Sequence, residues 1–199
     1  MAITVELIKE LREKTGCGMM DCKAALKEAK GDKEKAVEIL RKKGLASAAR
    51  RAGRVAAQGL IDSYIHIGGK IGVLVEVNSE SDFVAKNIEF QGFVKDITMQ
   101  IAASNPQYVT RDDVPDSIIQ HEKSILEEQV KESGKPAKAL EKIVEGRLEK
   151  FYSEICLMDQ PFIKDPKITV KDLLASLVAK IGENIVVRRF TRYQLGEKS

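Results

Sequence analysis

Hydrophobic positions near the N-terminus recur with the period of an α-helix, in three segments separated by short breaks at glycine. Apolar residues three or four positions apart form one stripe along each segment. Thr4 precedes the first segment and Asp32 the third, and both residue types are common helix N-caps. The pattern predicts three helices packed as a small bundle over residues 1–45, with the third helix ending near Gly44. A core of this size is marginal alone, so we expect it to be tethered to a larger domain.

The hydrophobic period changes to that of β-strands after a basic stretch, residues 46–58, which we interpret as a connecting helix. Isoleucine or valine then recurs at alternate positions on either side of Gly68-Gly69, between Gly59 and Asn78. Two glycines tolerate the positive φ of a two-residue hairpin turn, so the stretch predicts a β-hairpin. Because Leu74 makes the second strand apolar on both faces, we expect packing on each side of that strand.

Helical spacing returns after the hairpin and dominates the chain until a final strand. Two charged amphipathic helices lie within residues 117–155, and Gly134-Lys135-Pro136 between them predicts the turn of a helical hairpin. A further apolar helix ends at Gly182, and Ile185–Leu195 is predicted to be a strand. The sequence therefore predicts an α+β fold. Its parts are the three-helix bundle over 1–45, the connecting helix over 46–58, and an α+β core over 59–199 with a small antiparallel sheet and the helical hairpin.

Composition narrows the class of protein. A net charge of +3 is too small to require a nucleic-acid partner, and no apolar run reaches the roughly 18 residues of a membrane helix. The charged N-terminus lacks the apolar centre of a signal peptide. Cys17, Cys22 and Cys156 match neither a metal-binding spacing nor a CxxC motif. We therefore expect a cytoplasmic protein with free thiols and no membrane contact.

Residue types that carry out catalysis are present, but they form no recognisable constellation. His66 and His121 lie in unrelated settings, without a serine, cysteine or acid placed for a triad. Gly68-Gly69 lacks the Gly-Lys-Ser/Thr of a phosphate-binding loop. The carboxylates mix with lysines along helices, as they do on exposed faces. The sequence thus predicts no enzyme, no catalytic residue, no metal and no cofactor.

The stretch Asn78–Lys86, NSESDFVAK, joins the second strand to the next helix and is unusual for a turn. Turns are mostly polar because their backbone is solvated, yet this one runs straight into Phe83 and Val84. We call residues 81–84 the tip. Phe83 either folds back into the core while Ser81 or Asp82 caps the next helix, or it projects with Asp82 into a partner protein.

A second unusual feature is the pair Met19 and Met20, directly after the glycine-rich break at residues 16–18. Methionine is adaptable and recurs on protein-binding surfaces. Lys23, one turn later, would place a charge at the rim of such a patch. The alternative is that one methionine packs within the bundle and the other is incidental.

Two clusters of arginine raise the possibility of RNA binding. Their members are Arg50, Arg51 and Arg54 in the first cluster and Arg188, Arg189 and Arg192 in the second. Only 5% of the residues are aromatic, and no basic face carries the stacking aromatics that single-stranded RNA favours. We therefore favour a solvated helix face and a charged edge strand that blocks unwanted pairing, and we expect no direct nucleic-acid contact.

Four segments together resemble one protein family. They are Leu11–Leu26 (LREKTGCGMMDCKAAL), Glu76–Lys86 (EVNSESDFVAK), Gly134–Asp165 and Ile181–Phe190 (IGENIVVRRF). They span nearly the whole chain in the right order and resemble bacterial elongation factor Ts. In the second segment Ser81 replaces the family's usual threonine and keeps its hydroxyl.

Members of that family are guanine-nucleotide exchange factors for elongation factor Tu. The resemblance implies that the N-terminal bundle has a ubiquitin-associated-type fold and docks on the partner's nucleotide-binding domain. The residues implied for this contact are Leu11, Met19, Met20 and Lys23. The resemblance also implies that the tip enters beside the partner's magnesium and nucleotide site, where it would promote GDP release. The residues implied for this contact are Ser81, Asp82, Phe83 and Val84.

The chain is short for this family. Longer members resemble a core with two similar subdomains, and the present sequence has room for roughly one. The resemblance implies that short members act as homodimers in which each subunit contributes half of the core. We therefore expect a homodimer, with the strand Ile185–Leu195 as the candidate for its two-fold interface.

Overall fold

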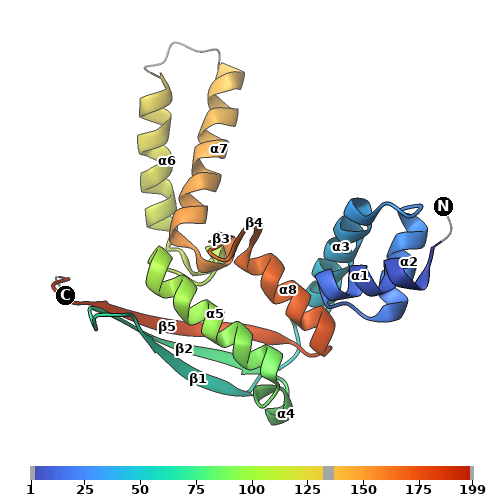
Figure 1. The fold of residues 1–199 in the computed structure, drawn as a ribbon. Coiled ribbons are helices and arrows are strands. Elements are labelled where there is room, and N and C mark those ends of the chain that lie inside the picture. The colour runs from blue at the N-terminus through green and yellow to red at the C-terminus, as the bar shows by residue number, and fades with distance from the viewer. Residues whose placement is uncertain (1–2, 132–136, 198–199) are drawn as a thin grey trace. The chain divides into compact units, whose positions relative to one another are not determined.

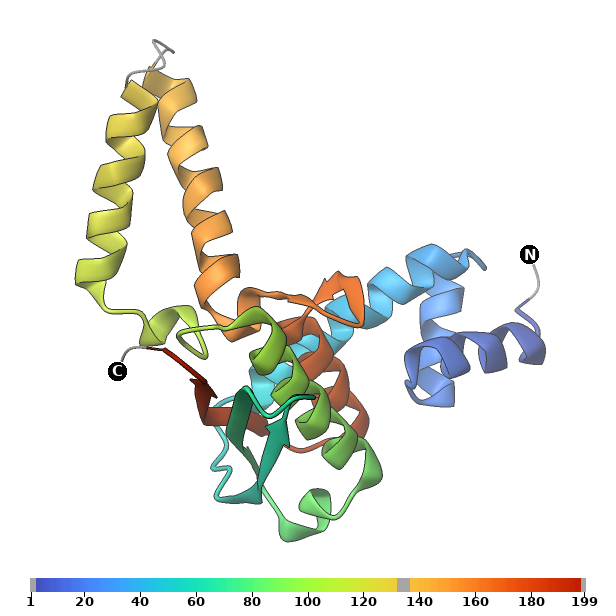
Figure 2. The same ribbon diagram turned by 60° about the vertical axis from the view of Figure 1, so that its left-hand side comes forward.

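The computed structural model describes residues 3–131 and 137–197, and it describes side chains in these ranges except at positions 130–141. It confirms the predicted α+β class, with helices and small antiparallel sheets (Figures 1 and 2). The helices are α1 Val5–Thr15, α2 Met19–Glu28, α3 Lys33–Arg51, α4 Asp82–Ala85, α5 Ile88–Ser104, α6 Asp116–Lys131, α7 Ala137–Ile155 and α8 Val170–Ile181. The strands are β1 Gln58–Ile65, β2 Ile71–Ser79, β3 Pro161–Phe162, β4 Asp165–Thr169 and β5 Ile185–Gln194.

The chain divides into two compact units, and each contains segments that are far apart in the sequence. The first unit comprises Met1–Asp62, Glu76–Lys95 and Asp172–Arg188. The second comprises Ser63–Val75, Asp96–Lys171 and Arg189–Ser199. The N-terminal bundle therefore shares a unit with the tip and with most of α8. Within the described residues, no helix is both long and apolar enough to cross a membrane.

Helices α1, α2 and α3 form the predicted N-terminal bundle, and both predicted N-caps are confirmed. The amide of Leu7 donates to Oγ1 of Thr4 at 3.3 Å, and the amide of Lys35 donates to Oδ1 of Asp32 at 3.0 Å. Such caps satisfy amides that have no partner within the helix. The buried core consists of Ile8, Leu11, Cys22, Ala25, Leu26, Ala29, Ala36 and Leu40.

Helix α3 corrects the prediction of a break at Gly44 and of a separate connecting helix over 46–58. The helix runs without interruption to Arg51, and β1 begins at Gln58. Gly44 is buried and has no positive φ, and a Cβ added to it would lie 3.8 Å from both the Ala175 carbonyl and the Ala179 side chain. Gly44 is thus the residue where α3 packs against α8, and it does not end the helix.

Strands β1, β2 and β5 form a three-stranded sheet in the order β1-β2-β5. The amide of Leu195 donates to the Lys70 carbonyl at 2.8 Å, and the amide of Asn184 donates to the Glu80 carboxylate at 2.6 Å. The two contacts join opposite ends of β5 and β2, so these strands are antiparallel. The predicted final strand is confirmed, and it lies at an edge of the sheet.

The connection between β1 and β2 is longer than the predicted two-residue turn. It comprises residues 66–70, and the amide of Gly69 donates to the His66 carbonyl at 2.9 Å. Gly68 and Gly69 have φ values of 89° and 69°. Both glycines are therefore needed for their positive φ, as predicted. The turn that contains them begins at His66, two residues before Gly68.

One face of the sheet is covered and the other is open. The β2 residues Val73, Val75 and Val77 are buried, and α5 runs across this face in both ribbon views (Figures 1 and 2). Leu74, on the opposite face of β2, is 51% exposed. Within the described residues of this single chain, the expected packing is therefore present on one face of β2 and absent on the other.

Helices α6 and α7 lie side by side as predicted (Figures 1 and 2). Leu126 and Val144 are buried between them, and a second cluster around Ile155 and Cys156 lies at the base of the pair. The predicted turn at Gly134-Lys135-Pro136 lies outside the described residues. The ribbon of β3 and β4 after α7 was not predicted, because β3 has only two residues and shows no period.

Candidate partner-binding site

The turn between β2 and α5 carries an exposed aromatic side chain. This turn contains the short helix α4 (Figure 1). Phe83, on that helix, is 80% exposed, whereas its neighbour Val84 is only 7% exposed. The interpretation of Phe83 as part of the core is therefore wrong. The structure also divides the predicted tip, because Val84 anchors it in the protein interior while Asp82 and Phe83 lie outside.

The polar start of the tip is fixed by hydrogen bonds. Ser81 occupies the N-cap position of α4, but its hydroxyl donates to Oε1 of Glu183 at 2.7 Å and makes no capping bond to the helix. The buried Ser79 donates to the Ser81 carbonyl at 2.8 Å. The prediction that Ser81 or Asp82 caps the helix through its side chain is thus wrong for Ser81, whose hydroxyl holds the turn to a distant loop.

Charges flank the exposed ring. Nζ of Lys86 donates to Oδ2 of Asp82 at 2.9 Å and lies 5.9 Å from the centroid of the Phe83 ring. This hydrogen bond, together with the positive charge, lowers the pKa of the exposed Asp82 carboxyl. Asp82 is therefore ionised at neutral pH, so the tip presents an aromatic ring beside one anion and one cation.

The N-terminal bundle carries the second predicted contact surface. Met20 is 74% exposed, and Met19 and Lys23 are also exposed at the start of α2. Neither methionine belongs to the bundle core, so the interpretation of one as a packing residue is wrong. Leu11, at 2% exposure, lies within that core. Its predicted contact with a partner is corrected, because a buried side chain presents no surface for binding.

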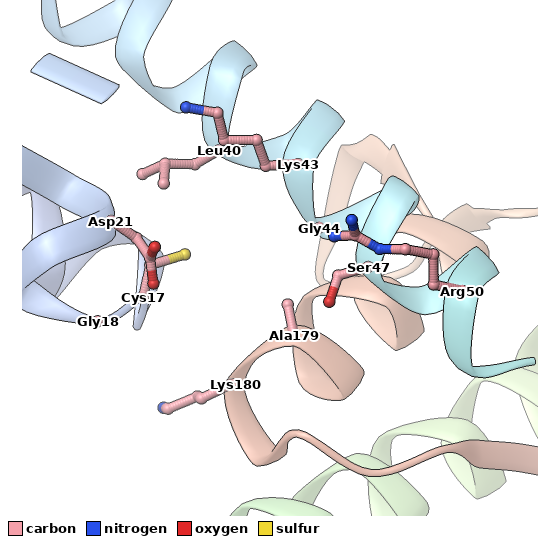
Figure 3. Close-up of a pocket in the computed structure, with 10 residues that line it drawn as sticks. All are labelled: Cys17, Gly18, Asp21, Leu40, Lys43, Gly44, Ser47, Arg50, Ala179 and Lys180. Carbon is pink, nitrogen blue, oxygen red and sulfur yellow. The ribbon is translucent and has the colours of Figure 1, made fainter. Parts of the chain in front are cut away.

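A pocket of about 400 Å³ lies between the loop before α2 and the helices α3 and α8 (Figure 3). The Cys17 thiol points into this space from the loop, and Arg50 extends toward it from α3. A Cβ at Gly16 would lie 3.0 Å from Nζ of Lys180, which also pairs with Glu89. The glycine-rich break therefore lies directly against a basic side chain of α8.

Comparison with known proteins places this arrangement in a family. The family model for elongation factor TS matches residues 6–197 of the chain. The chain belongs to the elongation factor Ts family.

Curated relatives that carry the name elongation factor Ts align along nearly the whole chain. The protein from Carboxydothermus hydrogenoformans is 63% identical over 195 residues, which cover 98% of this chain and 90% of the relative. The protein from Alkaliphilus oremlandii is 62% identical, with coverage of 99% and 91%. The protein from a Thermoanaerobacter species is 60% identical, with coverage of 98% and 96%. The resemblance inferred from the sequence is thus confirmed.

In this chain the three cysteines are free thiols. Burial raises the pKa of Cys22, and it raises the pKa of Cys156 to about 11. Both thiols are therefore protonated at neutral pH and unreactive as nucleophiles. Among the described residues, no group of three or more His, Cys, Asp and Glu side chains is placed to bind a metal.

Several arginines of the two predicted clusters make contacts within the protein. Nε of Arg51 donates to the Gly182 carbonyl at 3.0 Å, and Arg54 lies 3.5 Å from the Glu80 carboxylate. Arg192 is bound by Glu197 and Gln194. Contacts of this kind compete with phosphate binding, and they give these arginines a structural role.

Nothing in the local sequence pattern singles out Glu183, which binds the tip through Ser81. The two residues are 102 positions apart, and no local period connects them. The only available signal was that IGENIVVRRF, the segment that contains Glu183, resembles the family.

Proposed function

We propose that this protein is a guanine-nucleotide exchange factor for elongation factor Tu. The observation that carries the proposal is the exposed Phe83, held on a turn whose neighbours Ser81 and Val84 are anchored. Burial of an exposed aromatic side chain by a partner is favourable, because it removes apolar surface from water. A factor of translation acts where ribosomes are, so we place the protein in the cytoplasm.

The proposed mechanism acts on the partner's magnesium site and does not require contact with the nucleotide. Phe83 would displace side chains of elongation factor Tu that support this site, and Asp82 would disturb the polar network near the ion. Magnesium demands near-ideal octahedral geometry, so a small displacement of its supporting groups weakens its binding. Weaker magnesium binding in turn loosens the phosphates of GDP, which promotes its release.

Reciprocity sets the size of the required interaction. If the protein weakens GDP binding by a given factor, GDP weakens binding of the protein by the same factor. A roughly thousandfold effect corresponds to about 4 kcal/mol of coupling. Burial of one phenylalanine side chain supplies only about 1.5–3 kcal/mol. Phe83 alone is therefore insufficient, and a second contact must hold the partner in its open form.

The exposed Met19, Met20 and Lys23 supply the proposed second contact. They lie within the first five residues of α2, and flexible methionines adapt to the surface of a partner. In this proposal the N-terminal bundle binds the nucleotide-binding domain of elongation factor Tu through these residues. Leu11 supports the contact only from inside the bundle.

Release of fluorescent GDP from purified elongation factor Tu tests the proposal. At fixed magnesium concentration, we expect this protein to accelerate release by orders of magnitude, with an effect that saturates as its concentration rises. An RNA-binding protein or a general adaptor would leave the rate unchanged. Unchanged release at saturating protein would therefore contradict the exchange function.

We further propose that the protein forms a homodimer through the open face of its sheet. A Cβ at Gly72 would lie 3.1 Å from Cδ1 of Ile65, so Ile65 lies on the same face as Gly72 and the half-exposed Leu74. An exposed apolar face of this kind supports a self-complementary interface, in place of the strand Ile185–Leu195 expected from the sequence.

The dimer proposal predicts that Leu74→Lys shifts the protein to the monomer. In the dimer, each subunit would then bury one lysine ammonium group in the interface. Burying such a charge costs several kcal/mol when no opposite charge lies beside it. Sedimentation equilibrium should give twice the chain mass for the unaltered protein and a single chain mass for Leu74→Lys. Lys171→Glu, at an exposed position of α8, is the control and should remain dimeric. A monomeric unaltered protein at micromolar concentration would contradict the proposal.

A further inference from the structure

Two glutamates join the segment after β2, at Glu80 and Ser81, to the loop before β5, at Glu183 and Asn184. The Glu183 carboxylate accepts hydrogen bonds from the Ser81 amide at 2.9 Å and the Ser81 hydroxyl at 2.7 Å. In the opposite direction, the Glu80 carboxylate accepts a hydrogen bond from the Asn184 amide at 2.6 Å. Each segment thus supplies a carboxylate to a backbone amide of the other.

The loop that holds the tip is itself held by α3 and by the residues that follow this helix. The buried Asn184 donates through Nδ2 to the Arg54 carbonyl at 2.8 Å, and Arg51 donates to the Gly182 carbonyl at 3.0 Å. Near the first residues of α8, at the end of the helix away from this loop, Nε of Arg41 donates to the buried carboxylate of Asp172 at 3.0 Å. The loop at residues 182–184 is therefore fixed from two sides and can act as a rigid support.

From this geometry we propose that Glu183 is a positioning residue that fixes the direction in which Phe83 projects. Ser81 is the last residue before α4, and it lies two positions before Phe83. Its amide and hydroxyl both bind one carboxylate, so rotation of the backbone at Ser81 would break two hydrogen bonds. Hydrogen bonds to a carboxylate are among the stronger ones in proteins. The inference rests on the proposed exchange function and adds to it a residue that need not touch the partner.

The requirement for a fixed tip follows from the energetics of binding. A flexible Phe83 must be ordered when it enters a partner, and this loss of freedom reduces the free energy available to displace the partner's side chains. A tip held in advance avoids that cost. Glu183 is therefore expected to affect the maximal rate of GDP release more than the concentration at which the protein saturates.

The first measurement reports the tip directly. The chain contains no tryptophan, so Phe83→Trp introduces a single indole whose fluorescence anisotropy reports motion of the tip. We expect Glu183→Ala in this background to lower the anisotropy. Glu183→Gln should restore it, because the amide oxygen can accept from the Ser81 amide while its NH₂ group donates to the Ser81 hydroxyl.

The second measurement is GDP release with Phe83 unaltered. We expect Glu183→Ala to lower the maximal release rate about tenfold, which corresponds to about 1.4 kcal/mol, and Glu183→Gln to restore most of it. In a Phe83→Ala background, Glu183→Ala should have little further effect, because its action passes through the aromatic ring. Glu154→Ala, which removes an exposed glutamate of α7, is the matched control and should leave both readouts unchanged.

Three outcomes would overturn the proposal in different ways. A lower urea midpoint for Glu183→Ala with unchanged anisotropy and unchanged maximal rate would reduce Glu183 to a stabilising role. Full loss of activity in Glu183→Gln as well as Glu183→Ala would show that the charge, not the position of Ser81, matters. Absence of acceleration by the unaltered protein would remove the exchange function itself, and the role of Glu183 with it.

Discussion

Phe83→Ala should lower the maximal rate of GDP release from elongation factor Tu by roughly ten- to a hundredfold. The range follows from loss of about 1.5–3 kcal/mol when the ring is no longer buried in the partner. Because Phe83 is 80% exposed in the protein alone, its removal should change the free energy of unfolding by less than about 0.5 kcal/mol. Stopped-flow release of fluorescent GDP and urea denaturation measure the two quantities separately.

A substitution in the N-terminal bundle provides the comparison. Met20→Asp changes an exposed side chain on α2, and we expect it to raise the concentration needed for half-maximal release with little effect on the maximal rate. Phe83→Ala should show the opposite pattern. Equal maximal rates for Phe83→Ala and the unaltered protein would contradict insertion of the tip and transfer the mechanism to the bundle.

The sequence predicted elements whose residues interact locally. The period of the apolar positions located the N-terminal bundle, the hairpin and the final strand, and Thr4 and Asp32 act as the predicted caps. Leu11 lies at helical spacing from the apolar residues of the first helix, and the structure has it buried in the bundle core. The contact that the resemblance implied for Leu11 therefore conflicts with the local apolar pattern.

Long-range contacts could not be predicted in this way. Gly44 was interpreted as a helix end because glycine commonly ends helices, but α8 packs against it and the helix continues. Phe83 allowed two interpretations because a turn sequence does not show whether its aromatic residue points inward. The pairing of Ser81 with Glu183 depends on two loops that the folded chain brings together. For Gly44 and Ser81 the physical reason is the same, namely that the partner of the residue lies far away in the sequence.

Gly59→Ala should have the largest effect on stability, a loss of about 3 kcal/mol or more in the free energy of unfolding. Gly59 has a φ of +130°, and a Cβ there would lie 2.1 Å from the Val77 carbonyl oxygen and 2.7 Å from Cα of Asn78. Both atoms belong to the backbone of β2, so they cannot move aside as a flexible side chain would. The strain of the φ angle alone costs about 1–3 kcal/mol, and the contact forces β1 away from its neighbour.

A matched substitution separates this effect from a general cost of replacing glycine. Gly92 lies on the exposed side of α5, and a Cβ there meets no atom within 4 Å. Because alanine is the better helix former, Gly92→Ala should raise stability by about 0.5–1 kcal/mol. Urea denaturation of the two variants should thus give shifts of opposite sign. If the Gly59→Ala protein were as stable as the unaltered chain, β1 would be able to shift relative to β2. The close approach of the two strands at Gly59 would then not constrain their pairing.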